Sequence, residues 1–336
     1  MTHLIPYHLG AAAIATAVLF ATGPVSAQGS KQVFATNGVG SAANRVGAAI
    51  SGVVSQKTSH TMVATAYAGP SVYVPLLSQG RAQFGFMNGV DSLHAYRGTK
   101  PYYNQAHSDF RLAAIGLTNF HAWVVRKDSG IRTAADLKGK RIAGIYAGHS
   151  TCRQLASAHL ANYGLTPNDV TIVPSTGAVS SIKLLASGRV DAATCAVVGM
   201  GVIREADAQI GVRHLSMDPS PEAVTRFREK FPSGQPVKVD SHVGPALPEP
   251  TWVWEYPFYL VTSTNTSDQA VYDTVKAVWE NLDDLRGTMA AFNRWKKERM
   301  ASVGATVPYH DAAIRFYKEK GVWSSELEAQ QTQQLK

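Results

Sequence analysis

The residues best suited to hold another molecule are small and polar, and they lie where apolar runs give way to helical patterns. In the stretch 33–50, Gly38 and Gly40 allow the backbone to turn and to approach a ligand closely, and Ser41 stands where a helix N-cap belongs. The free N–H groups and the positive end of that helix would face whatever lies in front of the loop. This loop favours an anion or a group rich in acceptor oxygens, although an ordinary capped turn would have the same sequence.

Further loops of this kind follow along the chain, each at the expected end of a strand. Such loops can hold a ligand through backbone N–H groups, hydroxyls and helix dipoles, and plain helix capping is the alternative for each. The candidate ligand-binding residues from these loops and from the connecting segments are Thr36, Asn37, Gly38, Gly40, Ser41, Tyr67, Gly69, Asn88, Asp91, Asn119, Gly148, His149, Ser150, Thr151, Arg153, Thr176, Gly177, Thr194 and Tyr256.

The sequence does not carry the residue patterns of the common enzyme classes. It has no G-x-S-x-G, H-E-x-x-H or G-x-x-x-x-G-K-[ST] motif. Residues 38–43 match G-x-G-x-x-A, but the strand expected at 59–66 does not end in the acidic residue that would hold a ribose. Because the histidines are scattered, we predict no catalytic centre, no metal site and no cofactor.

The chain has two cysteines, Cys152 and Cys195. An oxidising compartment would allow a disulfide between them. Their spacing does not show whether their Cα atoms come within the roughly 4.4–6.8 Å that a bridge needs, so free thiols are the alternative.

The N-terminus has the pattern of a secretory signal. An uncharged run over residues 9–22 is followed by Gly23-Pro24 and by Val25-Ser26-Ala27, a small-x-small cleavage site. The run is shorter than the roughly 20 residues of a membrane span, and the first eight residues carry no Lys or Arg, which is unusual for a signal. We predict cleavage after Ala27 and a periplasmic location, with a buried N-terminal helix as the alternative.

Length and charge describe a globular protein with two cores. A chain of 336 residues exceeds the size of about 250 residues at which single cores usually stop growing. Hydrophobic residues make up 45% and charged residues 17%, as in folded rather than disordered proteins. The net charge of +8 comes from basic residues that are dispersed or paired with acids, as in 294–299, so a solvated helix face explains them and no nucleic-acid partner is predicted.

Strand, polar loop and helix recur three times between residues 33 and 97, and a second series begins with a strand at 141–146 and a helix at 152–163. Such alternation predicts an α/β fold with mainly parallel sheets, helices on both faces and ligand loops at the carboxyl ends of the strands. We expect a signal peptide at 1–27, the first part of lobe 1 at 28–120, lobe 2 at 121–255, and a return at 256–336 that completes lobe 1. The crossings at 118–124 and 256–261 would form the hinge.

The order and spacing of several short stretches resemble the TAXI-type solute receptors of tripartite ATP-independent periplasmic (TRAP) transporters. The resemblance covers residues 32–325 and implies a two-lobe, type II-like venus-flytrap fold that performs no catalysis. It also implies a small organic anion, usually a carboxylate, as ligand and the membrane permease of a TRAP transporter as partner. The stretches are Thr36-Asn-Gly-Val-Gly-Ser41, Gln83-Phe-Gly-Phe-Met87, Ala95-Tyr-Arg-Gly98, Ala134-Ala-Asp-Leu-Lys-Gly-Lys-Arg-Ile142, Gly188-Arg-Val-Asp-Ala192 and Tyr256–Thr262.

One loop of the second lobe departs from the family pattern. Where the family usually reads like Gly-Ser-Gly-Thr, this chain has Gly148-His-Ser-Thr151. His149 could donate a hydrogen bond to a ligand carboxylate, most readily when protonated, or could face outward. Arg153 could instead grip the carboxylate with two hydrogen bonds, and Asp91 could hold the ammonium group of an amino acid.

The sequence therefore predicts an exported, monomeric receptor that closes two lobes over a carboxylate, with amino acids and dicarboxylates among the candidates. An enzyme on the same scaffold, or a binding protein that feeds a sensor, would have a similar sequence. The solute itself is left open.

Overall fold

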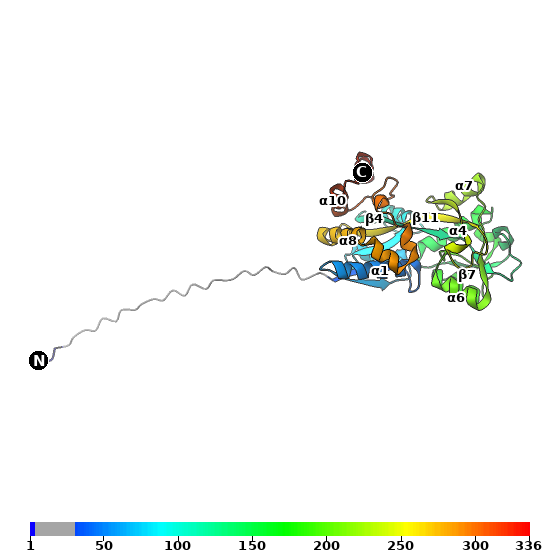
Figure 1. Cartoon of the computed structure of the whole chain (residues 1–336), viewed down its shortest axis with the longest axis horizontal. Coiled ribbons are helices and arrows are strands. Elements are labelled where there is room, and N and C mark those ends of the chain that lie inside the picture. The colour runs from blue at the N-terminus through cyan, green and yellow to red at the C-terminus, as the bar shows by residue number, and fades with distance from the viewer. Residues whose placement is uncertain (4–30) are drawn as a thin grey trace.

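The structure is a computed structural model that describes residues 1–3 and 31–336. The predicted signal segment lies, beyond its first three residues, outside this range. The chain forms two lobes, each built around its own sheet, and two long strands run between them (Figure 1). The predicted two-lobe α/β fold is thereby confirmed, with parallel strands on one side of each sheet and antiparallel strands on the other.

Lobe 1 begins with three strand–helix units. The central strand of this parallel group pairs with both others, through Val33↔Val63 and Phe34↔Phe84 among other pairs. Its residues Phe34 and Ala35 are completely buried, because helices cover both faces of the sheet. The units are β1 (Lys31–Thr36), α1 (Ala42–Lys57), β2 (Thr61–Ala66), α2 (Pro70–Ser78), β3 (Phe84–Asn88) and α3 (Gly89–Arg97).

Lobe 2 is also a sheet flanked by helices, and its shorter strands have the order β7-β6-β8-β5-β9. A separate cluster of buried apolar side chains, which includes Val124, Ile182 and Ile203, forms its core. The elements are β5 (Val124–Arg126), β6 (Arg141–Ile145), α4 (Ser150–Asn162), β7 (Thr171–Ser175), α5 (Ala178–Ala186), β8 (Ala192–Ala193), α6 (Gly201–Ile210), β9 (Val212–His214) and α7 (Pro221–Lys230).

Two long antiparallel strands, β4 (Phe110–His121) and β11 (Thr251–Ser263), connect the lobes. They pair from Phe110↔Ser263 to His121↔Trp254, so the two segments that the sequence predicts as crossings lie side by side near Asn119↔Tyr256. Strand β10 (Gln235–Val239) extends the same sheet along the first residues of β11. The exact lobe boundaries at residues 120 and 255 remain a prediction.

The C-terminal helices pack on lobe 1, where Val275, Leu285 and Phe316 join its apolar core. The residue pattern over 289–301 predicts a helix, but the chain forms two short 3-10 turns, Ala290–Arg294 and Lys297–Arg299, because the buried Trp295 stacks on Phe86 between them. The helices are α8 (Asp268–Glu280), α9 (Leu282–Thr288), α10 (Asp311–Glu319) and α11 (Ser325–Gln334). No helix in the described part of the chain combines the length and apolar composition that a membrane crossing needs.

Candidate functional site

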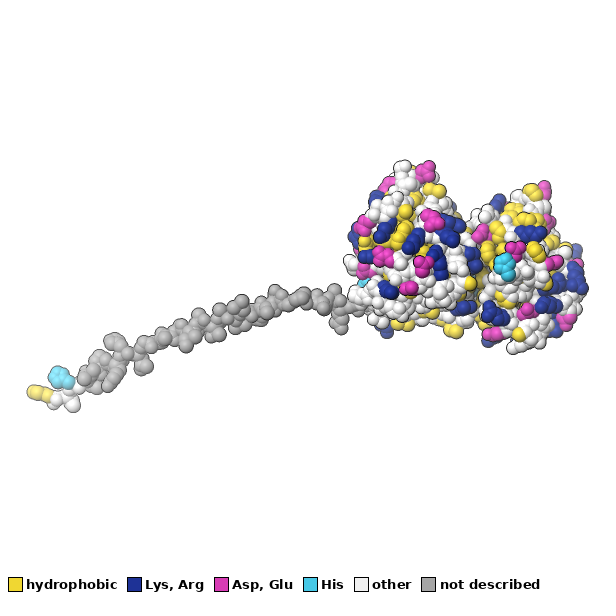
Figure 2. Space-filling model, viewed as in Figure 1, with side chains coloured by type: hydrophobic (Ala, Val, Ile, Leu, Met, Phe, Trp, Pro, Cys, Tyr) yellow, Lys and Arg dark blue, Asp and Glu magenta, His cyan; other side chains and the backbone are white. Residues whose placement is uncertain are grey.

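Two small adjoining hollows, of about 120 Å³ and 30 Å³, lie between the lobes, and together we call them the central cavity. Figure 2 shows the two lobes as separate bodies with a notch between them. Both hollows are lined by Asn37 and Ser41 from lobe 1 and by His149 and Ala178 from lobe 2. The carboxyl ends of strands in both sheets therefore deliver side chains to one space between the lobes, as the α/β pattern predicts.

Three helices begin at this cavity. Their N-cap residues, Ser41 of α1, His149 of α4 and Gly177 of α5, all line its larger hollow. Each helix start adds partial positive charge and N–H groups that have no partner within the helix. Their convergence favours an anion or a polar group with acceptor oxygens in this space.

Side-chain hydrogen bonds fix the conformation of the loop between β1 and α1, residues 37–41. Ser41 Oγ accepts a hydrogen bond from Asn44 N at 3.1 Å, and Thr36 Oγ1 accepts one from Asn44 Nδ2 at 3.0 Å. Gly40 adopts a positive φ of 82°, which favours glycine at this turn. Asn37 Oδ1 is buried and has no hydrogen-bond partner among the described residues, so this oxygen can accept a hydrogen bond from a ligand while Thr36 shapes the loop.

His149 points toward the cavity in its neutral form. Its Nδ1 accepts a hydrogen bond from Cys152 N at 3.4 Å, which assigns the ring proton to Nε2. Burial lowers the pKa of His149 to about 4. The expected protonated donor is thus corrected: near neutral pH His149 would offer a ligand its Nε2–H without a positive charge, because desolvation disfavours the imidazolium.

The two lobes touch beside the cavity. A Cβ at Gly69 would lie 2.5 Å from Gly148 O and 2.7 Å from His149 Cγ. Only a residue without a side chain allows the loops of the two lobes to approach this closely. Gly69 and Gly148 therefore act through backbone contact between the lobes.

A buried network centred on Asp91 also joins the lobes. Its carboxylate accepts hydrogen bonds from Ser150 Oγ at 2.5 Å, Thr151 Oγ1 at 2.9 Å and Tyr103 OH at 3.3 Å. Asn88 Nδ2 donates to Thr151 Oγ1 at 2.8 Å. Burial raises the pKa of Asp91 to about 6, although these hydroxyl groups and Arg153 act to lower it.

This network corrects the expected role of Asp91. Its two oxygens are occupied by hydroxyl groups from α3's own lobe and from the start of α4, and Asp91 does not line the central cavity. Asp91, Asn88 and Ser150 therefore hold the two lobes together, and an ammonium group in the cavity would not meet the carboxylate.

Arg153 also lies away from the cavity. Its Nη2 donates to Pro101 O at 3.3 Å, and its guanidinium lies 5.2 Å from the ring centre of Tyr102. The prediction that Arg153 binds a carboxylate in the cavity through two hydrogen bonds is therefore wrong for this arrangement. Arg153 does reach the Asp91 network through its charge, since it acts to lower the pKa of Asp91.

The structure brings about half of the candidate residues to the central cavity. Tyr67 packs near Tyr73, Thr194 O accepts hydrogen bonds from Ser181 and Tyr146, and neither residue lines the cavity. Asn119 and Tyr256, which are paired on β4 and β11, reach the cavity from the strands that connect the lobes. The candidates that line the cavity are Asn37, Gly38, Ser41, Asn119, His149, Thr151, Thr176, Gly177 and Tyr256.

The structure joins Cys152 and Cys195 by a disulfide, with 4.9 Å between their Cα atoms. Cys195 lines the smaller hollow, so the bridge ties the start of α4 to the cavity wall. Ligand atoms of His149 and both cysteines lie within 4.8 Å of one another, a spacing that a metal ion could use. Bridged sulfurs have no thiolate to offer, so these residues could hold a soft metal only after reduction.

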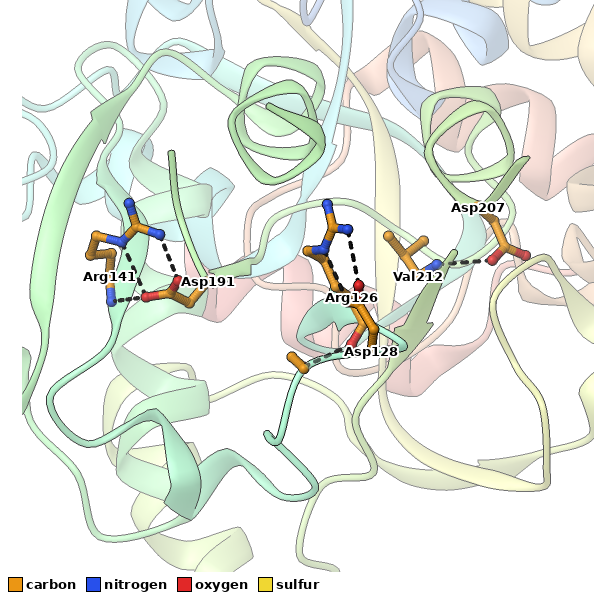
Figure 3. A network of polar contacts seen from close by, with 7 residues as sticks. Arg126, Asp128, Arg141, Asp191, Asp207 and Val212 are labelled. Atoms are coloured by element: carbon orange, nitrogen blue, oxygen red, sulfur yellow. Dashed lines mark hydrogen bonds and ion pairs between the residues drawn. The ribbon is translucent and has the colours of Figure 1, made fainter. Parts of the chain in front are cut away.

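A separate hollow of about 530 Å³ lies in lobe 2, and its two arginines already have partners. Figure 3 shows Arg141 bonded to Asp191 and Arg126 bonded to Asp128, with Nη2–Oδ1 and Nε–Oδ1 distances of 2.7 and 3.0 Å. Because each of these arginines is paired with a carboxylate, the hollow offers an anion little net attraction.

A larger pocket of about 570 Å³ adjoins the central cavity and was not predicted from the sequence. It contains Arg45, Arg204 and Arg294. These arginines stand in helical patterns that read equally well as solvated faces, and Arg294 belongs to the expected helix that the structure replaces with 3-10 turns. The spacing of residues in the sequence therefore does not predict that these three arginines share a pocket.

Comparison with known structures supports the same fold. A periplasmic transporter matches with a TM-score of 0.59 at 13% identity, over 93% of this chain and 99% of the other. The periplasmic binding protein BugD matches with a TM-score of 0.56 at 10% identity, over 91% and 95%. R. palustris Rpa4515, solved with adipate, matches with a TM-score of 0.51 at 17% identity, over 77% and 87%.

These likenesses establish the two-lobe fold of periplasmic solute-binding proteins. The family comparison goes further, because the family model matches residues 34–321, which include both lobes and both connecting strands. The chain belongs to the NMT1-like family.

Proposed function

We propose that this protein is an extracytoplasmic receptor that captures a small organic acid between its lobes. The observation that carries the proposal is the convergence of three helix N-termini, capped by Ser41, His149 and Gly177, on one cavity between the lobes. Helix starts of this kind attract carboxylate oxygens, and the neutral N–H groups of the His149 ring (Nε2) and of the Asn37 side-chain amide (Nδ2) would orient them. None of these groups requires chemistry on the ligand, so we propose binding without catalysis.

Capture would proceed by closure of the lobes. In the described arrangement Gly69 meets Gly148, and the Asp91 network joins α3 to α4, so the lobes are in contact at two places beside the cavity. A ligand that touches both lobes favours this closed state over an open one. The paired strands β4 and β11 would bend as the hinge.

We further propose that the chain is exported by a cleaved signal at residues 1–27, acts as a monomer, and is a TAXI-type receptor that delivers its solute to a TRAP permease. The proposal of an acid as ligand agrees with the adipate found with Rpa4515, a protein of the same fold. An uptake assay would test the partner: vesicles that contain candidate permease subunits should accumulate the solute without ATP only when this protein is added. Uptake that requires ATP would contradict the TRAP assignment.

A thermal-shift screen of residues 28–336 would test the receptor function. Carboxylic acids, sulfonic acids, amino acids and neutral sugars would be added at matched ionic strength. A ligand present at 100 times its Kd should stabilise the fold by about 2.7 kcal/mol, and we expect this from acids and not from sugars. If no small solute raises the melting temperature, the proposed function is wrong.

A further inference from the structure

The pocket of about 570 Å³ beside the central cavity, which we call the arginine pocket, is built by both lobes. Lobe 1 contributes the first turn of α1 and the 3-10 turn that carries Arg294, and lobe 2 contributes the segment that leads into α6. It shares Ala42, Asn119, Val197 and Met200 with the central cavity. A solute in the central cavity could therefore extend into the arginine pocket.

The charge that lines the arginine pocket is of one sign. Arg45, Arg204 and Arg294 contribute to its wall, and none of its lining residues, all of them in the described part of the chain, is acidic. None of the ion pairs found among the described residues includes any of these three arginines. This differs from the separate hollow of lobe 2, where Arg126 and Arg141 are paired with carboxylates.

Arg294 is held in place by contacts that leave part of its guanidinium free. Its Nε donates to Thr118 O at 2.8 Å, and its Cζ lies 4.7 Å from the ring centre of Phe120. Neither of its Nη groups has a hydrogen-bond partner among the described residues. Burial lowers the pKa of Arg294, while the charge of Glu255 acts to raise it. A fixed, partly desolvated guanidinium without a paired acid is a strong anion binder.

The start of α6 supplies a second feature that favours an anion. Its N-cap residue Met200 makes no capping hydrogen bond through its side chain, and both Gly199 and Met200 line the pocket. Ile203 N donates to Met200 O at 3.1 Å, while the N–H groups of Gly201 and Val202 have no partner among the described residues and remain available next to Met200 at the pocket wall.

We propose that the arginine pocket is a second anion subsite and that the solute is a dianion, such as a dicarboxylate or a carboxylate–sulfonate, with an apolar middle. One acidic group would lie at the three helix starts of the central cavity and the other at Arg294. Leu117, Val197 and Ala290 give the pocket an apolar wall along which the middle of the solute would pass. This inference rests on the proposed function, because it takes the central cavity as the first subsite.

Matched pairs of acids would test the second subsite by calorimetry. Adipate would be compared with hexanoate and terephthalate with benzoate, on the full mature chain and on the variants Arg294→Gln and Arg204→Gln. We expect wild-type protein to bind the diacids at least tenfold more tightly than the monoacids. Arg294→Gln should weaken diacid binding about 10- to 100-fold and monoacid binding less than twofold, as expected for loss of a charge-assisted hydrogen bond.

Two further variants control for folding and for net charge. Arg204 is exposed on α6, so Arg204→Gln keeps the fold and should still weaken diacids selectively, even if Arg294→Gln destabilises the protein. Arg81 is exposed and lies before β3, at the end of the sheet opposite the cavity, so Arg81→Gln removes one charge elsewhere and should leave both affinities unchanged.

The outcomes separate this inference from the proposed function. Equal affinity for monoacids and diacids in the wild type, or equal weakening of both by Arg204→Gln, would overturn the second subsite and leave the receptor intact. Binding of no acid by the wild type would overturn the proposed function and the subsite with it.

Discussion

His149 shows how position changes the chemistry of a side chain. The sequence places a titratable ring among small residues and suggests a cationic donor. The structure buries the ring as the N-cap of α4 and lowers its pKa to about 4, so its remaining donor is a neutral Nε2–H. The burial of the ring, which no local pattern shows, decides between these two roles.

Replacement of His149 by Asn separates its two roles. Asn is a good N-cap and should preserve the start of α4, but its shorter side chain would not carry the Nε2–H donor into the cavity. We expect an unchanged melting temperature and roughly fivefold weaker acid binding, the effect of about 1 kcal/mol for one neutral hydrogen bond. Calorimetry from pH 5 to 8 should show no change in affinity that depends on His149, since its pKa lies below this range; a change that disappears in the variant would contradict the neutral assignment.

Gly69 tests whether the lobes must touch. In Gly69→Ala the new Cβ would stand 2.5 Å from Gly148 O, so closure should be blocked while each lobe keeps its fold. We expect acid affinity to fall at least tenfold with a melting temperature, measured without ligand, that falls by only a few degrees. Gly52→Ala is the matched control, because no heavy atom lies within 4 Å of a Cβ at that site in α1. Equal affinity in the two variants would show that the Gly69 contact is not needed for binding.

At the scale of elements, α3 and α4 are joined by a buried carboxylate rather than by apolar packing alone. Asp91 lies in the first turn of α3, and its oxygens accept from Ser150 and Thr151 in the first turn of α4. Each helix belongs to a different lobe. These hydrogen bonds form only when the first turns of α3 and α4 lie side by side, so they stabilise the closed arrangement of the lobes.

Asp91→Ala should weaken this coupling. Hydrogen bonds to a charged group contribute about 1.5–3 kcal/mol each, so loss of the network should reduce acid affinity about 10- to 100-fold by destabilising the closed state. Asp91→Asn keeps one acceptor oxygen and should lose less. Small-angle scattering of the unliganded protein should show a larger radius of gyration for the Ala variant; identical radii together with identical affinities would refute a role of Asp91 in closure.

The elements that could be predicted are those with strong local signals. The units from β1 to α3, and the helices α4, α5, α7 and α8, follow apolar periodicity with recognisable caps, and the cavity loops lie at their junctions. Strand β9, with three residues, is too short to show a period, and β10 is a half-exposed partner of β11. Arg294 could not be assigned to the site, because its position depends on Trp295 and Phe120 rather than on its neighbours in sequence.

For the whole molecule, buried histidines predict how stability depends on pH. Burial lowers the pKa of His149, His159 and His214 to about 4, 3 and 4, below the value near 6.5 of an unfolded chain. Each contributes stability that is present above pH 6.5 and lost as the pH falls toward its folded pKa. Asp91, with its pKa raised to about 6, has the opposite effect on the pH dependence of stability. This single carboxyl group does not offset the three histidines.

We therefore expect the melting temperature to fall as the pH is lowered from 7 to 4.5. Near pH 5 unfolding should take up about two protons or more, which corresponds to a slope of roughly 3 kcal/mol per pH unit. His214→Met replaces a buried ring outside the cavity and should reduce this uptake by about one proton. A melting temperature that rises on acidification would show that the histidines do not titrate as their burial indicates.

The central claim is that a small acid binds between the two lobes, against three helix starts. A crystal structure of residues 28–336 with the acid that stabilises the protein most would test it directly. We predict closed lobes, an acid group in contact with Asn37 and His149, and the remainder of the solute directed toward Arg294. An acid bound on the outer face of either lobe, or in an open cleft without contact to both lobes, would contradict the account.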